Sequence, residues 1–162
     1  MKKILIGILI LAGSSLWSMH HKDSASPIVF AIDLFVTEGK VEEAISFTKK
    51  ITRHVKSTEK GTVVYEYYFT PDGKKCFLYE IYKNSDAALR HVNDFISGDF
   101  EEEFLTYFTI NSFQVLGSAK LDLKLALQEF TSDFRTLEEG FKRSKKRKKS
   151  DKRPMKMRKK TG

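Results

Sequence analysis

The sequence predicts an α+β domain in which two helices pack on one face of a four-stranded antiparallel sheet. Two apolar-aromatic runs between Thr62 and Tyr82 flank Pro71-Asp72-Gly73-Lys74, and a proline-glycine combination of this kind is typical of the turn of a β-hairpin. Apolar residues at helical spacing follow both the first strand-like run and this hairpin. With a last strand-like run at 109–117, the order is β-α-β-β-α-β, which is the ferredoxin-like arrangement.

The first strand is expected at Ile28–Thr37, where apolar residues occupy both faces of the strand. Glu38-Gly39 then provides a turn. From Lys40 to Thr58 apolar residues recur at helical spacing, and the stripe that they form is wide enough to cover a sheet.

The second helix is expected directly after the hairpin, because the apolar period changes there from two to about 3.6. Ser85 is the expected N-cap, since its hydroxyl can accept backbone N–H bonds. Five apolar residues share one face of this helix: Ala88, Leu89, Val92, Phe95 and Ile96.

A short helical pattern is expected at Asp99–Phe108, where three phenylalanines stand four residues apart. Thr109–Gly117 is the last expected strand. The following segment, Lys120–Phe141, has apolar residues at steps of three and four and is predicted to be helical. Its apolar face needs a partner, either the same domain or a second subunit.

Residues 1–18 are predicted to be a secretory signal peptide, because Lys2-Lys3 precede a short apolar run that ends in small residues. Residues 19–27 are polar and are expected to be a disordered lead-in. We therefore expect an exported protein, periplasmic or secreted, which remains anchored in the membrane if the signal is retained. The single cysteine, Cys76, has no partner for an internal disulfide and is interpreted as a small buried strand residue.

A basic tail is predicted at residues 142–162, which hold 13 Lys or Arg and one acidic residue, against 16 basic and 20 acidic residues before them. Like charges should keep this tail extended and disordered. It is expected to bind an anionic membrane surface or another polyanion through counterion release. Nucleic acid is a less favoured partner, because no aromatic residues interleave the charges. The densest run of charge is Lys145, Lys146, Arg147, Lys148 and Lys149.

The segment CFLYEIYKNSDAALRHV resembles the core of the antibiotic biosynthesis monooxygenase (ABM) domain family. Members of that family have an aromatic-Tyr-Glu-x-aromatic strand that leads into an Ala-Leu-rich helix with one histidine. Tyr79-Glu80, Tyr82, Ala87-Ala88-Leu89 and His91 occupy the matching positions. The family pattern usually has Trp in place of Tyr82, and often Pro-His-Phe in place of Gly98-Asp99-Phe100.

This resemblance spans about Ile28–Phe141 and implies an ABM-like domain at 28–119, followed by a C-terminal extension at 120–141 of the kind found in some members. It also implies that the sheets of two subunits pair face to face in a dimeric α+β barrel. The activity that it implies is oxidation of a quinol or similar small aromatic substrate by O₂, with no cofactor.

The apolar pattern of the strands independently favours a homodimer. A sheet face that meets water should alternate to polar residues, but the first strand is apolar on both faces. The hairpin also offers Val63, Tyr65, Tyr67 and Phe69 on one side and Val64 and Tyr68 on the other. The alternative is that the chain covers this face with its own segment 120–141.

A candidate pocket follows from the hairpin. If its loop has an even number of residues, Tyr65 and Tyr67 share a face with Leu78, Glu80 and Tyr82, whereas an odd loop separates them. Phenols and a carboxylate would give an apolar pocket the few polar groups that small-molecule sites usually have.

His91 is the candidate general base, because a neutral imidazole accepts a proton near pH 7. In the ABM family the corresponding histidine lies on the second helix, near the cleft between helices and sheet. The alternative is a structural histidine bonded to a backbone carbonyl, to Glu80 or to Asp94. The candidate catalytic residues are therefore His91 and Tyr82, and the candidate substrate-binding residues are Tyr65, Tyr67, Glu80 and Phe104.

Two functions are consistent with these features. The first is a cofactor-independent monooxygenase, and the second is a non-catalytic dimer that binds a small hydrophobic molecule and is tethered to anionic surfaces by its tail. The sequence contains no glycine-rich phosphate loop, CxxC, HExxH or GxSxG motif, so it gives no motif-based support to nucleotide, metal or serine-hydrolase chemistry. No residue is a candidate metal ligand.

Overall fold

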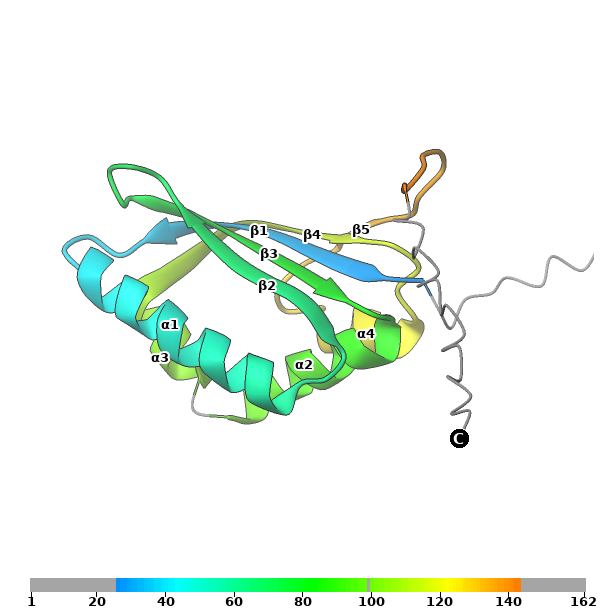
Figure 1. The fold of residues 1–162 in the computed structure, drawn as a ribbon, viewed down its shortest axis with the longest axis horizontal. Coiled ribbons are helices and arrows are strands. Elements are labelled where there is room, and N and C mark those ends of the chain that lie inside the picture. The colour runs from blue at the N-terminus through cyan, green and yellow to red at the C-terminus, as the bar shows by residue number, and fades with distance from the viewer. Residues whose placement is uncertain (1–25, 99, 144–162) are drawn as a thin grey trace, which may run out of the picture.

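The computed structural model describes residues 26–98 and 100–143. Its helices and strands follow the predicted order, with a short strand in place of the second part of the predicted C-terminal helix (Figure 1). In chain order they are β1 Ile28–Val36, α1 Val41–Thr58, β2 Thr62–Phe69, β3 Lys75–Tyr82, α2 Ser85–Ser97, α3 Phe100–Tyr107, β4 Phe108–Leu116, α4 Leu121–Ala126 and β5 Asp133–Arg135. The predicted signal peptide, most of the lead-in and the tail from residue 144 lie outside the described residues.

The strands form one sheet in the order β2-β3-β1-β4-β5. The pairs β2–β3, β3–β1 and β1–β4 are antiparallel, as expected for a ferredoxin-like domain, and β5 adds a short parallel strand next to β4. The predicted α+β fold is therefore confirmed, with five strands in place of four. Within the described ranges no helix has the length and hydrophobicity that crossing a bilayer requires.

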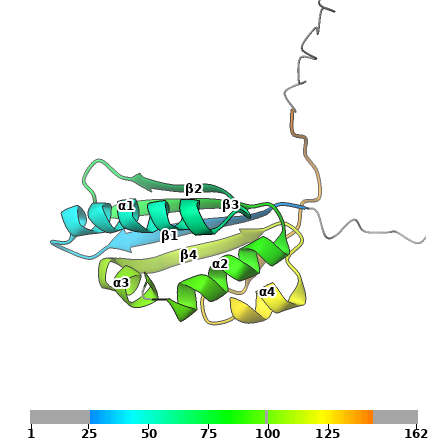
Figure 2. The same cartoon turned by 60° about the horizontal axis from the view of Figure 1, so that its bottom comes forward.

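The helices lie together on one side of the sheet (Figures 1 and 2). Because side chains of a strand alternate between faces, Ile28, Phe30, Ile32 and Leu34 of β1 all point into this layer and are buried. Helix α1 covers them with the apolar stripe that includes Phe47. The core thus occupies the space between the sheet and its helices, which is also where the candidate site residues lie.

The hairpin turn forms as predicted. Thr70 and Lys75 close the turn through backbone hydrogen bonds, and the Asp72 carboxylate accepts bonds from the Thr70 hydroxyl and the Lys74 N–H. Gly73 has φ +70°, and a Cβ at this position would lie 2.6 Å from Val41 Cγ1. Glycine is therefore required twice, by the backbone conformation and by contact with the start of α1.

The expected N-cap of the second helix is wrong by one residue. Asn84 has an extended conformation and its side chain accepts the Ala87 N–H, so Asn84 is the N-cap of α2. Ser85 is the first residue of the helix and is buried, and its hydroxyl accepts the Lys120 N–H. Asparagine is as good an N-cap residue as serine. Because Asn84 caps the helix, the Ser85 hydroxyl is free to bind the backbone of the C-terminal segment.

The prediction of a helix over 120–141 is wrong beyond Ala126. The chain turns after α4 because Leu127 is buried among the core residues and the Thr131 hydroxyl donates to the Phe113 carbonyl of β4. The chain then runs beside β4 as β5. Helix α4 packs beside α2 on the helical side, so this segment does not cover the opposite face of the sheet (Figure 2).

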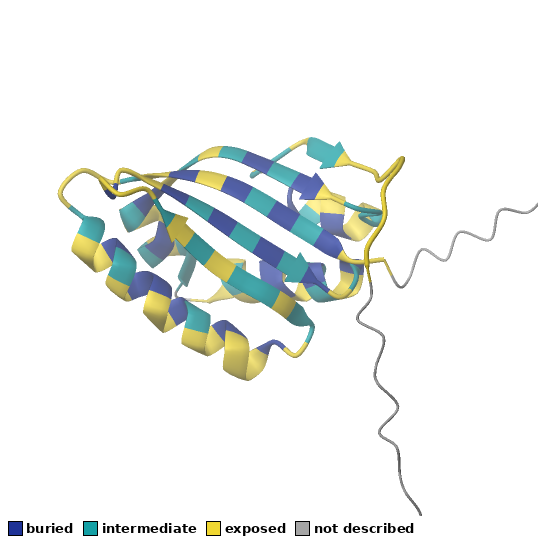
Figure 3. Cartoon of the chain, turned by 45° about the horizontal axis from the view of Figure 1, so that its top comes forward, coloured by how far each residue is buried: buried dark blue, intermediate teal, exposed yellow. Residues whose placement is uncertain are grey.

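That opposite face is mostly apolar along β1 and β3 but also carries Asp33, Glu66, Ser112 and Gln114, and none of the described helices lies over it (Figure 3). Its residues are exposed or half-buried. They include Val29, Ala31 and Phe35 of β1, Tyr68 of β2, and Phe77, Tyr79 and Ile81 of β3. The two-sided apolar pattern of the sequence is thus present in the fold, and the homodimer that it favours stays a prediction.

Candidate functional site

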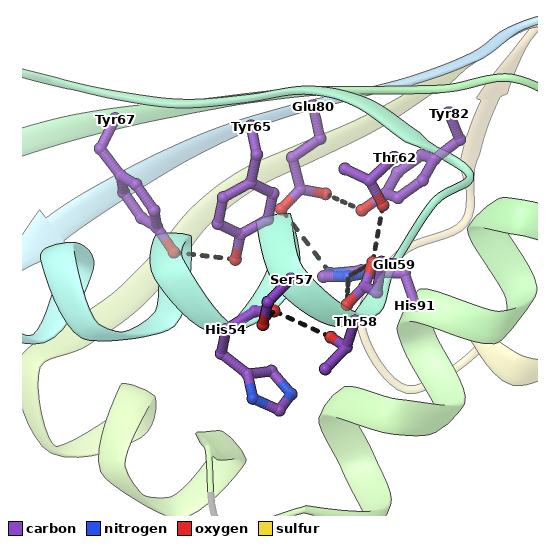
Figure 4. A network of polar contacts seen from close by, with 10 residues as sticks. All are labelled: His54, Ser57, Thr58, Glu59, Thr62, Tyr65, Tyr67, Glu80, Tyr82 and His91. Atoms are coloured by element: carbon purple, nitrogen blue, oxygen red, sulfur yellow. Dashed lines mark hydrogen bonds and ion pairs between the residues drawn. The ribbon is translucent and has the colours of Figure 1, made fainter.

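The hairpin register brings most of the candidate residues to the helical side of the sheet. Tyr65 pairs with Glu80 and Tyr67 with Leu78, so the loop has an even number of residues and the predicted sharing of one face is confirmed. Tyr82 points in the same direction, two residues beyond Glu80. Helix α2 places His91 next to the side chains of Glu80 and Tyr82, on the side that faces away from the sheet (Figure 4).

A small apolar cavity of about 60 Å³ lies between the sheet and the helices. Three of its lining residues carry a polar group: Tyr65, Glu80 and His91. The others are Phe30, Ile32, Leu78, Val92, Phe95, Phe104, Ile110, Phe113, Leu127 and Phe130. The polar groups therefore gather on one wall of an otherwise apolar space, as in many small-molecule sites.

His91 lies between two buried carboxylates. Its Nδ1 is 2.9 Å and 3.0 Å from the two oxygens of Glu59, and its Nε2 is 3.8 Å from Glu80 Oε1. The Thr62 hydroxyl also donates to Glu59 at 2.6 Å, and the Tyr82 hydroxyl donates to Glu80 at 2.6 Å. The result is a connected chain of polar groups from the end of α1 to the centre of β3 (Figure 4).

The two carboxylates determine the protonation of His91. Burial alone would lower the pKa of His91, but the charges of Glu80 and Glu59 and the Glu59 hydrogen bond outweigh burial, and the pKa is raised. Burial raises the pKa of Glu80. Burial also acts to raise the pKa of Glu59, but the hydrogen bond and charge of His91 lower it overall. Glu59 is therefore the anion and His91 the favoured proton carrier.

The buried tyrosines are neutral hydrogen-bonding groups. Burial raises the pKa of Tyr65, Tyr67 and Tyr82 well above the usual value of a phenol. The hydroxyls of Tyr65 and Tyr67 are 3.1 Å apart and bond to each other. Because these phenols stay protonated, they can donate hydrogen bonds but cannot act as bases near neutral pH.

The structure divides the candidate residues into two groups. His91, Glu80, Tyr65 and Phe104 line the cavity. Tyr82 is fully buried behind Glu80, so it can affect a bound molecule only through that carboxylate. The remaining candidate, Tyr67, lies beside a surface groove between α1 and β2. The basic run 145–149 lies outside the described residues.

Glu59 is the site residue that sequence reasoning missed. It ends α1 as the C-cap, and its contact with His91 joins residues 32 positions apart, which no local pattern reveals. One signal was available, because a carboxylate is unfavourable at a helix C-terminus, where the helix dipole is negative. An acidic residue there points to a compensating cation elsewhere in the fold.

Neither a reactive cysteine nor a metal-binding cluster is found at this site in the described residues. Burial raises the pKa of Cys76 to about 12, so the thiol is not a nucleophile, in agreement with its interpretation as a buried strand residue. Across residues 26–98 and 100–143, no three His, Cys, Asp or Glu side chains are placed to hold a metal ion together.

No protein-family model and no curated protein matches this chain. Solved structures do match its fold. MupZ from Pseudomonas fluorescens superposes with a TM-score of 0.61 at 21% identity, over 72% of this chain and 94% of that chain. A Bacteroides thetaiotaomicron protein of unknown function, described as a possible oxidoreductase, superposes with a TM-score of 0.50 at 16% identity, over 57% of this chain and 97% of that chain.

A second Bacteroides protein, named as a candidate antibiotic biosynthesis monooxygenase, has a TM-score of 0.46 at 16% identity, over 59% of this chain and 90% of that chain. The chain shares the fold of MupZ, and its element order and antiparallel strand pairs are those of a ferredoxin-like domain. At these identities the likeness concerns the fold alone, and the activity of this chain has to be argued from its own residues.

Proposed function

We propose that this ABM-like protein is a cofactor-independent monooxygenase that oxidises a quinol or a similar small aromatic molecule with O₂. The observation that carries the proposal is the placement of His91, which Glu59 holds through Nδ1 while Nε2 stands at the cavity wall beside Glu80. Ionisable groups with shifted pKa values are costly to bury, and they gather preferentially where a site needs them.

In this proposal His91 Nε2 takes a proton from a hydroxyl of the quinol, and the resulting anion is electron-rich enough to react with O₂ directly. One oxygen atom bonds to a ring carbon, and the other leaves as water with the two hydrogens that the substrate gives up. A quinol and O₂ thus give a hydroxyquinone and water, and the substrate supplies all the electrons. Because the carboxylates raise the pKa of His91, the base form becomes dominant only above the usual histidine range, so the rate should rise with pH there.

The cavity limits how the substrate binds. A cavity of about 150 Å³ accepts benzene, whereas this one measures about 60 Å³. It has room for a water or a dioxygen molecule but not for an aromatic ring. An aromatic substrate must therefore displace lining side chains, and the half-buried Phe95 and Phe130 are the ones that can move with the least loss of packing.

The proposal is tested by measuring O₂ consumption with a panel of reduced quinols. We expect His91→Gln to lower the rate by about 10²–10⁴-fold, since glutamine can hold the Glu59 hydrogen bond but cannot take up the proton. Tyr82→Phe is the comparison variant and should cause a smaller loss, because Tyr82 acts only through Glu80. Uncatalysed background rates for every quinol with the wild type would rule out the enzyme.

The second candidate function is binding without catalysis, and the mostly apolar lining favours it. Such a protein would sequester a small hydrophobic molecule and be tethered to anionic surfaces by the basic residues outside the described ranges. Saturable binding of a quinol with no O₂ uptake and no product would favour this function over the enzyme.

We also propose that the protein is a homodimer that pairs the open faces of two sheets. Tyr79, at the middle of this face, stacks with Phe77 at 6.3 Å between ring centroids. Tyr79→Lys would place a charge in an apolar interface and should convert a dimer into a monomer at micromolar concentration, as measured by sedimentation. Leu125→Lys, on the exposed side of α4, is the control and should remain dimeric. A wild-type monomer at this concentration would refute the proposal.

A further inference from the structure

Glu59 lies between the protein surface and the buried polar groups. Its side chain is only 6% exposed, yet it lines two surface clefts of about 220 Å³ and 260 Å³. Glu80 does not line these clefts and borders the internal cavity instead. Of the two carboxylates that contact His91, Glu59 is therefore the one that solvent reaches, and Glu80 is the one that a molecule in the cavity reaches.

His91 connects these two ends. Its Nδ1 contacts Glu59 at hydrogen-bond distance, and its Nε2 faces the cavity beside Glu80. An imidazole can take a proton at one nitrogen and release a proton from the other, so this geometry can move a proton between the clefts and the cavity. Neighbouring apolar side chains offer no such path, because Val92 and Phe95 flank His91 on α2.

We propose that Glu59 is the residue through which the buried site exchanges protons with solvent, because it holds His91 at Nδ1 and accepts the proton from that nitrogen. This inference rests on the proposed function, for which it supplies the proton route. When His91 takes the substrate proton at Nε2, the Nδ1 proton passes to Glu59 and then to solvent. The reverse sequence returns a proton when water forms, and it also restores the first tautomer. Each transfer moves one proton and no electrons.

Other ionisable groups around His91 do not offer an equivalent route. Asp94, on the same helix, is exposed and acts on His91 only through its charge. Tyr65 lines both the cavity and one of the clefts, but its hydroxyl bonds to Tyr67 and not to the imidazole, and the Tyr82 hydroxyl donates to Glu80. Beyond Glu59, His54 acts on this carboxylate only through its charge. The Glu59 carboxylate is thus the group in contact with both the imidazole and the surface clefts.

The test compares glutamate-to-glutamine changes at the two ends of the network in the full chain. The exchange rate of the His91 ring N–H with solvent and the titration of the ring are both followed by nitrogen NMR. We expect Glu59→Gln to slow exchange by at least about tenfold and to lower the pKa of His91, since a carboxylate partner is lost. Glu80→Gln removes the cavity end and should leave the exchange rate within about threefold of wild type.

If the His91 ring N–H exchanges with solvent as fast in Glu59→Gln as in the wild type, the proposal is overturned. If that variant does not fold, Glu80→Gln decides alone, because a tenfold slowing there would place the proton route on the cavity side. Oxygen uptake separates this inference from the proposed function. Absence of turnover with the expected exchange pattern would refute only the monooxygenase, and turnover with unchanged exchange would refute only the role of Glu59.

Discussion

The Phe30→Ala variant is expected to lose about 3–5 kcal/mol of unfolding free energy, which is the usual cost of replacing a buried phenylalanine by alanine. Phe30 lies on β1, is 2% exposed and points into the helical layer. Its ring meets Tyr82 and Phe113 edge to face, with centroids 4.9 Å and 5.0 Å away. Such pairs add to the free energy of burial, so the loss should fall toward the upper end of this range.

Phe30 also lines the existing cavity of about 60 Å³, so its truncation should enlarge that space. Enlarged apolar cavities bind small apolar molecules. Benzene should therefore raise the melting temperature of the Phe30→Ala variant and leave that of the wild type unchanged. This comparison separates a specific cavity from general loss of packing.

Urea denaturation monitored by circular dichroism measures the change in stability. Phe141→Ala is the matched control, since the Phe141 side chain is 79% exposed and the same atoms are removed. We expect a change of no more than about 0.5 kcal/mol in this control. Equal losses in the two variants would contradict the assignment of Phe30 to the core.

The order of elements could be predicted from the sequence because local signals agree with the fold. The Pro71-Asp72-Gly73-Lys74 turn fixes the hairpin, and the register of its strands then places Tyr65, Glu80 and Tyr82 on one face without any tertiary information. The apolar stripes of α1 and α2 could also be predicted from local spacing, and residues of both stripes are buried.

The C-terminal segment and Glu59 could not be predicted from local patterns. Apolar residues spaced three and four apart in 120–141 predict a helix. The chain instead changes direction, because the Thr131 hydroxyl donates to the Phe113 carbonyl and β5 pairs with β4. The contact between Glu59 and His91 likewise depends on how α1 and α2 pack. Both are consequences of tertiary contacts that outweigh local propensity.

His91→Ala should destabilise the protein by about 3–5 kcal/mol at the pH where the effect is largest, because removing one partner of a buried ion pair leaves an uncompensated charge. The side chains of Glu59 and Glu80 are 6% and 2% exposed, and His91 is the cation between them. Without the imidazole, these two carboxylates would lose the cation that lies between them.

The loss of unfolding free energy in His91→Ala should depend on pH. The direction of this dependence follows from the pKa shifts of His91 and Glu59. The pKa of His91 is raised above the ordinary 6.5, so its stabilisation is complete below that value and is lost as pH rises through the folded-state pKa. The pKa of Glu59 is lowered below the ordinary 4.5, so its stabilisation is complete above that value and is lost as pH falls. The difference between wild type and His91→Ala should therefore be largest between pH 4.5 and 6.5.

Glu80 adds a separate pH dependence to the stability of the wild type, which begins above the ordinary pKa of 4.5. Burial raises its pKa, so the folded state binds its proton more readily than the unfolded state, and this contribution also falls as pH rises. Urea titrations at a series of pH values would give the profile. His54→Ala is the matched control, because His54 is exposed and its ring only lies tilted against Phe100, with ring centroids 4.8 Å apart. A His91→Ala loss as small and as flat with pH as the one in this control would show that His91 does not hold the two carboxylates together.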